Sequence, residues 1–182
     1  MKLLIASDLH GSATAAQKII NQFEYHRCEY LVLLGDLVNH GPRNPIPEGY
    51  DPLRLASILN PLSHHIIAVK GNCDSEVDQQ LLDFDILAPY NHLLIGHRRL
   101  YLTHGHDIGP KKPPKLNNQD ILCSGHSHIP VMEPLQNYWH FNPGSAALPR
   151  NGLPASAGII DDHSCTLITL NKGQTLWQHT LN

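Results

Sequence analysis

The chain has 182 residues, of which 41% are hydrophobic and 16% charged, a composition that argues against disorder and favours a globular protein. This length suits a single domain over residues 1–182, because two full domains would be cramped. The net charge is −3 and no long basic run occurs, so tight non-specific binding of nucleic acid has no electrostatic support.

Apolar runs and chain breakers alternate regularly over the first 71 residues. They predict strands at residues 2–7, 30–35 and 64–71 and helices at residues 12–28 and 52–60. Ser12 is the expected N-cap of the first helix, and Pro52 lies near the start of the second. Strands that alternate with helices in this way are expected to be parallel, with right-handed crossovers.

The loop at residues 36–52 follows the second strand and is the longest stretch without a periodic pattern. Long irregular loops in compact domains are often functional, although an ordered surface excursion explains this one equally well.

The pattern changes after residue 85, where short apolar runs with tight turns replace the helices. Hairpin turns are expected at "IGHRR" and "NKGQ". A parallel first half and a strand-rich second half predict two sheets packed face to face with helices outside. The expected strands cover residues 92–96, 98–105, 120–126, 129–134, 138–142, 156–161, 165–170 and 174–181.

The cysteines and the N-terminus bear on the compartment. Four cysteines without any C-x-x-C spacing favour neither a zinc ribbon nor a disulfide scaffold. "MKLLIASDLHG" has too short an apolar stretch for a signal peptide, and no apolar run approaches the about 20 residues of a membrane span. We therefore expect a cytoplasmic protein that does not bind membranes.

Polar residues follow five of the predicted strands, at the point where each strand ends. These residues occur in short sequences such as Asp-x-His, Gly-Asp and Gly-Asn. Each sequence taken alone is more often an ordinary turn than a metal site. Together, at the carboxyl ends of strands where ligands gather, they predict a metal centre. The candidate ligands are Asp8, His10, Asp36, Asn72, His104, His126 and His128.

The chemistry of these side chains indicates the kind of metal. Carboxylates, an amide oxygen and imidazoles suit Mn, Fe, Zn, Ni or Co better than copper(I) or an iron–sulfur cluster. Seven ligands are too many for one catalytic ion with an open position, but they suit two ions that share a carboxylate. Two ions about 3.5–4 Å apart can clamp an in-line displacement and lower the pKa of a bridging water.

The ordered set "SDLHG", "LGDLVNHG", "KGNCDS", "LTHGH" and "CSGHSH" resembles the motif series of the calcineurin-like metallophosphoesterases. The resemblance covers nearly the whole chain. "NHGPRN", "EGY", "GNCDSEVDQ" and "HFNPGS" are more similar still to a subgroup of small bacterial phosphodiesterases. This resemblance implies an α/β fold, namely a four-layer αββα sandwich with two packed mixed β-sheets.

The resemblance also implies how the ligands divide between two divalent ions, with Asp36 bridging. The first ion would be held by Asp8, His10, Asp36 and His128, and the second by Asp36, Asn72, His104 and His126. Mn²⁺ is the first expectation, with Zn²⁺, Fe²⁺, Ni²⁺ and Co²⁺ as alternatives. The "NPGS" at residues 142–145 is expected to orient ligands.

Other positions carry expectations about catalysis and substrate. Asn72, Cys73, Asp74 and His104 are the expected catalytic residues, and Asn39, Arg43 and His106 are candidates for contact with the substrate phosphate. Alternative roles remain open, a ligand-supporting one for His106 and a plain loop position for Arg43.

The sequence departs from the family at Cys73, where many members have a histidine held by the acidic residue that follows. A thiol of ordinary pKa, about 8.5, is a poor proton donor near neutral pH. Cys73 is not expected to be the nucleophile either, because it has no obvious base. Asp74 is kept and is expected to support the loop.

The implied function is hydrolysis of a small-molecule phosphodiester by a hydroxide that bridges the two ions. A phosphomonoesterase, a nuclease and a non-catalytic protein-interaction scaffold of the same fold are the alternatives. A scaffold usually lacks ligands, whereas every ligand position here holds a competent residue. Self-association through a sheet edge of the second half is also open.

Overall fold

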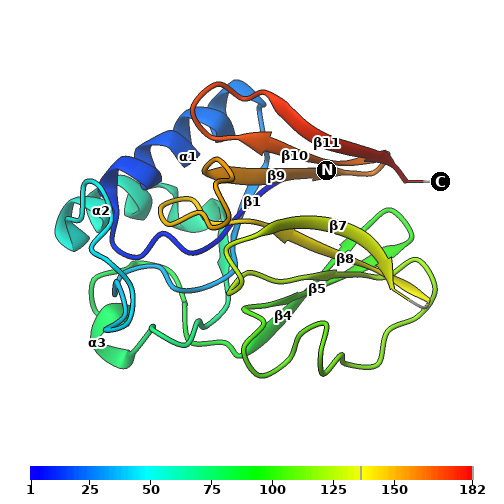
Figure 1. Cartoon of the computed structure of the whole chain (residues 1–182), viewed down its shortest axis with the longest axis horizontal. Coiled ribbons are helices and arrows are strands. Elements are labelled where there is room, and N and C mark those ends of the chain that lie inside the picture. Colours follow the sequence, from blue (N-terminus) through cyan, green and yellow to red (C-terminus); the bar gives the residue numbers. More distant parts are fainter. Residues whose placement is uncertain (136, 182) are drawn as a thin grey trace.

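Two β-sheets packed face to face form the body of the protein (Figure 1). The computed structural model describes residues 1–135 and 137–181. The N-terminus lies beside the C-terminal strands, away from the helices (Figure 1). No helix in the described part of the chain is long and apolar enough to cross a membrane.

The first sheet has six strands in the order β11-β10-β9-β1-β2-β3. The strands β1, β2 and β3 are parallel to one another, as the alternating pattern predicts, whereas β9, β10 and β11 join antiparallel. Strand β9 pairs with β1, so the C-terminal strands extend the sheet that the first half of the chain begins. Their bounds are β1 Lys2–Ala6, β2 Tyr30–Leu33, β3 Ile66–Ala68, β9 Ser156–Asp161, β10 Ser164–Thr169 and β11 Thr175–Thr180.

The second sheet has five strands in the order β4-β5-β6-β8-β7. Within it β5, β6 and β8 are parallel, while β4 and β7 pair antiparallel at the two edges. Both sheets are therefore mixed, and the predicted hairpin turn at residues 95–99 joins β4 to β5. The bounds are β4 Tyr90–Ile95, β5 Arg98–Thr103, β6 Ile121–Cys123, β7 Pro130–Leu135 and β8 Tyr138–Pro143.

The two predicted helices are present and begin where their capping residues indicate. Helix α1 (Ala13–Tyr25) starts after Ser12, whose side chain accepts a hydrogen bond of 3.1 Å from the Ala15 amide. Helix α2 (Pro52–Leu59) has Pro52 at its first position and continues into a 3₁₀ segment, η1 (Asn60–His65). The short α3 (Glu76–Gln79) was not predicted, because four residues are too few to show helical periodicity.

Alternation along the buried strands builds a core on each side of the first sheet. Leu3 and Ile5 of β1 pack between the sheets, whereas Leu4 and Ala6 face the layer of α1 and α2. Over the outer face of the second sheet, the helix-free segment 104–119 places Ile108 and Leu116 against the strands. The two-sheet architecture expected from the sequence is confirmed, with helices over one sheet and irregular chain over the other.

Candidate metal centre

The predicted ligands meet where five parallel strands end, three in one sheet and two in the other. Asp8 and His10 follow β1, Asp36 follows β2, and Asn72 follows β3. From the second sheet, His104 follows β5, and His126 and His128 follow β6. Because the chain must turn sharply away from each strand, five of these residues have positive φ angles, which Asp and His adopt more readily than bulky or β-branched residues. They are Asp8, His10, Asp36, His126 and His128.

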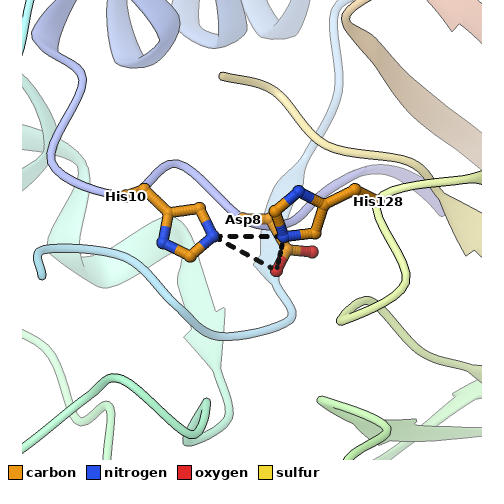
Figure 2. Close-up of side chains that lie close together, drawn as sticks. All are labelled: Asp8, His10 and His128. Atoms are coloured by element: carbon orange, nitrogen blue, oxygen red, sulfur yellow. Dashed lines mark hydrogen bonds and ion pairs between the residues drawn. The ribbon is translucent and has the colours of Figure 1, made fainter. Parts of the chain in front are cut away.

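A first group of ligand atoms surrounds the fully buried carboxylate of Asp8 (Figure 2). The His128 and His10 Nε2 atoms lie 3.2 and 3.7 Å from Asp8 Oδ1, and 3.2 Å from each other. Asp8 Oδ2 accepts a hydrogen bond from the His126 amide, but Oδ1 is buried and has no hydrogen-bond donor within residues 1–135 and 137–181. A buried carboxylate oxygen left without a donor is costly unless it binds a cation.

The histidine rings are oriented by backbone carbonyls. His10 Nδ1 lies 3.2 Å from the Asn39 oxygen, His104 Nδ1 2.7 Å from Leu34 and His128 Nδ1 2.7 Å from Leu148. A carbonyl can only accept, so each Nδ1 carries a hydrogen, and whenever the ring is neutral its Nε2 presents a lone pair to the site. The His10 and His128 Nε2 atoms then face each other as two acceptors 3.2 Å apart, an arrangement that a cation between them stabilises.

Asp36 lies between the first group and His104. Its Oδ2 is 3.8 Å from His10 Nε2 and 3.4 Å from His104 Nε2, and its Oδ1 accepts a hydrogen bond of 2.8 Å from the Cys73 amide. Burial raises the pKa of Asp36, but the hydrogen bond and charge of His104 and the Cys73 amide outweigh it and hold the pKa well below its usual range. This carboxylate is therefore ionised and faces ligands on both sides.

Asn72 and His126 complete the predicted set on the side of His104. Asn72 Oδ1 lies 3.1 Å from His104 Nε2, a second acceptor aimed at the same point. The His126 ring centroid is 5.1 Å from that of His104, and its side chain is exposed. Burial disfavours charged His104, yet Asp36 and Asp8 outweigh this effect and raise its pKa to about 9. Without a cation its Nε2 therefore carries a proton near neutral pH, and a bound metal ion would take the place of that proton.

The donor set fits divalent cations. Two carboxylates, an amide oxygen and histidine Nε2 lone pairs converge with almost no hydrogen-bond donor among them, and such hard-to-borderline ligands suit Mn, Fe, Zn, Ni and Co. Asp8 with His10 and His128, and Asp8 with Asp36 and His104, each bring ligand atoms within 4.8 Å of one another. Five of the predicted ligands, Asp8, His10, Asp36, His104 and His128, are thus gathered within these groups, with Asn72 and His126 beside His104.

Asp74 holds the loops that carry two of these ligands. Its buried carboxylate accepts three hydrogen bonds of 2.8 Å, from the amides of Asp36, Leu37 and Gly71. These contacts tie the end of β2 to the end of β3 and engage both carboxylate oxygens. Asp74 is therefore a positioning residue.

Cys73 has its sulfur within 4.8 Å of ligand atoms of His10 and Asp36. Burial, followed by the negative charge of Asp36, raises the pKa of the thiol to about 12, so it stays protonated near neutral pH. The loop that follows β2 packs closely over it, since a Cβ added at Gly41 would lie 2.7 Å from the Cys73 sulfur. This small residue sits under the loop as a neutral thiol.

The "NPGS" segment abuts the centre, as the sequence suggests. Ser145 Oγ donates a hydrogen bond to the Asp8 carbonyl and accepts one from the Leu148 amide, each at a distance of 2.8 Å. Asn142 Nδ2 donates to the Gly125 carbonyl, one residue before His126. These buried hydrogen bonds hold the turns that present Asp8 and His126.

A cavity of about 640 Å³ opens beside the ligands. Asn39 and Arg43, two of the predicted substrate contacts, line it, whereas exposed His106 lines a separate cavity of about 290 Å³ and pairs with Asp107 at 3.3 Å. Arg150 also lines the larger cavity and was missed by sequence reasoning; its only signal was a cationic side chain soon after the "NPGS" turn. The lining residues are Asp36, Asn39, Gly41, Pro42, Arg43, Asn44, Asn72, Cys73, His126, His128 and Arg150.

The protein has a polar cavity over a buried set of carboxylates and imidazoles, at the strand ends of a two-sheet sandwich. This combination of fold and site is typical of metal-dependent phosphoesterases. The model of the calcineurin-like phosphoesterase superfamily domain matches residues 1–164. The chain belongs to this superfamily.

The relatives within the superfamily agree with this assignment. The chain is 48% identical over 182 residues to phosphodiesterase YfcE of Escherichia coli strain K12. The aligned region covers 100% of this chain and 99% of YfcE. A solved structure of YfcE, a phosphoesterase, superposes with a TM-score of 0.97 over the whole of both chains. The probable metallophosphoesterase YsnB of Bacillus subtilis is 32% identical over 170 residues, 88% of this chain and 83% of YsnB.

A Zn²⁺ complex of Vps29 from Entamoeba histolytica, at 22% identity, has a TM-score of 0.65 with complete coverage of both chains. At this identity the likeness shows a shared fold alone.

Proposed function

We propose that this protein is a metal-dependent phosphodiesterase that hydrolyses a small-molecule diester. The observation that carries the proposal is the convergence of the Asp8 and Asp36 carboxylates with inward-facing histidine Nε2 lone pairs beside an open polar cavity. The full-length similarity to YfcE, a phosphodiesterase, supports it.

Two divalent ions, Mn²⁺ first among the candidates, would be held at this centre. Asp8, His10, Asp36 and His128 form one ligand set, and Asp36, Asn72, His104 and His126 form the other. When bound, the ions supply a bridging hydroxide as nucleophile and neutralise charge on the phosphoryl oxygens. Asp36 faces His10 and His104 at once, which supports its role as the shared ligand.

The side chains around the centre bind and orient the diester. Asn39 and Arg43 contact it from the loop after β2, and His106 approaches from the other side of His126. Asp74 keeps Asp36 and Asn72 in place through its three amide contacts.

Hydrolysis would form one P–O bond to the attacking oxygen and break the ester P–O bond opposite it. The leaving oxygen takes its proton from water, because the Cys73 thiol, with its pKa raised to about 12, is too weak an acid to donate one. Diesters are preferred to monoesters on the strength of the full-length similarity to a phosphodiesterase.

We also propose a cytoplasmic location and no nucleic-acid or membrane partner. The four cysteines are all free, which suits a reducing compartment, and no basic run is present in the sequence. Self-association through an edge strand such as β4 or β11 is a further prediction.

The direct test is hydrolysis of bis(4-nitrophenyl) phosphate with metal analysis of the purified protein. We expect turnover in added Mn²⁺ that is lost on chelation and falls at least about 100-fold in Asp36→Ala. Asp83→Ala, which removes an exposed carboxylate outside the cavity, serves as the control and should keep full activity. No turnover with any of several divalent metals would leave the scaffold hypothesis in its place, and a preference for 4-nitrophenyl phosphate would favour a monoesterase.

A further inference from the structure

The cavity beside the metal centre carries two guanidinium groups, those of Arg43, already placed on the substrate side of the centre, and Arg150. Arg43 and Arg150 lie on separate loops, one after β2 and one after β8, and both line the cavity. Within residues 1–135 and 137–181, neither guanidinium has an ion pair or a side-chain hydrogen bond. Both side chains are exposed at one polar cavity and are therefore available to an anionic ligand.

Both loops are anchored to the metal centre. The Asn39 carbonyl binds His10 Nδ1, and Asn39 Oδ1 accepts from the Gly41 amide, which fixes the loop two residues before Arg43. The Leu148 carbonyl binds His128 Nδ1, two residues before Arg150. Each arginine therefore has its backbone placed by the same contacts that orient a metal ligand.

The charge of the reacting group does not account for these arginines. Two divalent cations at the centre are neutralised by the Asp8 and Asp36 carboxylates, one hydroxide and the single negative charge of a diester. Asp36 is the sole acidic side chain among the cavity-lining residues that the structure describes, and it is a proposed metal ligand. The two guanidinium charges are left for a group elsewhere on the substrate.

The rest of the lining narrows the nature of that group. Asn39, Asn44 and Asn72 supply amides, and among the described residues no Phe, Tyr, Trp or long aliphatic side chain lines the cavity. Such a surface offers a nucleobase no Phe, Tyr or Trp ring to stack on and offers an acyl chain no apolar wall. Guanidinium groups instead match the planar, two-oxygen face of a phosphate or a carboxylate.

We propose that Arg43 and Arg150 bind a second anionic group, a phosphate or a carboxylate, on a hydrophilic arm of the substrate. The substrate class is then a diester of a phosphorylated or carboxylated polyol-like alcohol. This inference rests on the proposed function, since it places the diester phosphorus at the metal centre.

The test compares three small ligands that differ only at one end. Glycerol 3-phosphate has one anionic group, glycerol 1,3-bisphosphate adds a second phosphate, and 3-phosphoglycerate adds a carboxylate instead. Their dissociation constants are measured by isothermal titration calorimetry on the Mn²⁺-loaded full-length protein, as wild type, Arg43→Ala, Arg150→Ala and the double variant. Arg54→Ala is the matched control, because this exposed arginine lies on α2 in a different groove.

In the wild type, at least one of the two added anionic groups is expected to tighten binding about 10-fold or more, and the better one identifies the group. That gain should shrink about 5-fold in each single variant and disappear in the double variant, while Arg54→Ala retains it. Chelation of Mn²⁺ by the ligands cancels, because each gain is compared between proteins with the same metal content.

An unchanged gain in both arginine variants overturns the inference, as does an equal loss of affinity for all three ligands. Hydrolysis of bis(4-nitrophenyl) phosphate is measured on the same samples to separate the two proposals. Absent turnover with an arginine-dependent gain refutes the phosphodiesterase proposal alone. Normal turnover without such a gain refutes the inference alone.

Discussion

The ligand residues are held in backbone conformations that most side chains avoid. Asp8, His10, Asp36, His126 and His128 all have φ between 47° and 65°. Each such residue costs about 1 kcal/mol or more, and conformations of this kind persist where the surrounding structure fixes them. Here the amides of Asp8 and His10 are bound by the Gly35 and Asp36 carbonyls, which holds the two strand ends together. The strain is the consequence of turning ligands inward directly after buried strands.

Cys73 is expected to be dispensable for good leaving groups. Its thiol has a pKa raised to about 12, so replacing it should remove neither a nucleophile nor an effective acid. We predict that Cys73→Ala changes kcat for bis(4-nitrophenyl) phosphate by less than about 3-fold at unchanged metal content. In the wild type, kcat should fall steeply as the leaving-group pKa rises, measured on a series of substituted aryl and alkyl diesters.

Cys73→His tests the same idea in the opposite direction. An imidazole at this position should raise turnover of alkyl diesters about 10-fold and flatten the leaving-group dependence. The loop at Gly41 must shift to admit the ring, and its exposed residues 42 and 43 leave room for that movement. Loss of aryl ester hydrolysis in Cys73→Ala, with metal retained, would show instead that the thiol is catalytic.

His140 makes the folded protein sensitive to acid. Burial lowers its pKa, and the Glu133 carboxylate offsets this only in part. The unfolded chain therefore binds a proton at His140 more readily than the folded protein does. The stability associated with neutral His140 is present above the unfolded pKa of about 6.5 and is lost as pH falls towards the folded pKa.

Acidification from about pH 7 to pH 5.5 should lower the free energy of unfolding of the wild type. We predict that it lowers that of His140→Gln by less. Urea denaturation at several pH values measures it, with exposed His163→Gln as the matched control. The glutamine can retain a hydrogen bond to Ser124, whose Oγ lies 2.9 Å from His140 Nε2. An identical pH dependence in wild type and His140→Gln would refute this origin.

Among the strands, β8 and β9 show how closely the two sheets approach. Gly158 of β9 faces the fully buried ring of Phe141 of β8, and a Cβ at position 158 would overlap that ring. We predict that Gly158→Ala lowers the free energy of unfolding by about 2 kcal/mol or more, measured by urea denaturation, because the ring or a sheet must move.

The Phe141→Leu background is the control for this effect. A smaller side chain at 141 leaves room for the added methyl group, so Gly158→Ala should cost less there than in the wild type. An equal cost in both backgrounds would place the effect in the strand itself and contradict the overlap.

The whole molecule should respond to loss of its metal. Without cations, the Asp8 carboxylate and the His10 and His128 lone pairs face one another in a buried site. Ions that bind only the folded state stabilise it by about 2.7 kcal/mol each at 100 times their Kd. Chelation should therefore lower Tm by several degrees in calorimetry, and Mn²⁺ should restore it.

Asp36→Ala separates metal binding from general effects of the chelator. This variant loses the carboxylate that faces both His10 and His104, so its Tm should respond much less to added Mn²⁺. A wild-type Tm that is the same with and without metal would contradict a stabilising metal centre.

The position of the strands and of the predicted ligands could be inferred from local patterns. Apolar runs such as residues 2–6 must be buried, and the polar residues directly after them must leave the sheet at its carboxyl edge. The order of the motifs then indicated the family, which the comparison of residues 1–164 confirmed. Helix α3 was not predicted, because it is a four-residue helix whose local signal is a capping box between Ser75 and Asp78.

By itself, then, the sequence determined the strands, the two capped helices, the sandwich architecture and the residues that gather at the strand ends. Only the tertiary structure decided that β9 pairs with β1, that Asp74 binds three amides of two loops, and that Arg150 joins Arg43 at one cavity. The physical reason is how far apart in the sequence the interacting residues lie. Burial and capping depend on neighbours in the chain, whereas strand pairing, hydrogen bonds to carbonyls and the lining of a cavity depend on segments that meet only once the chain has folded.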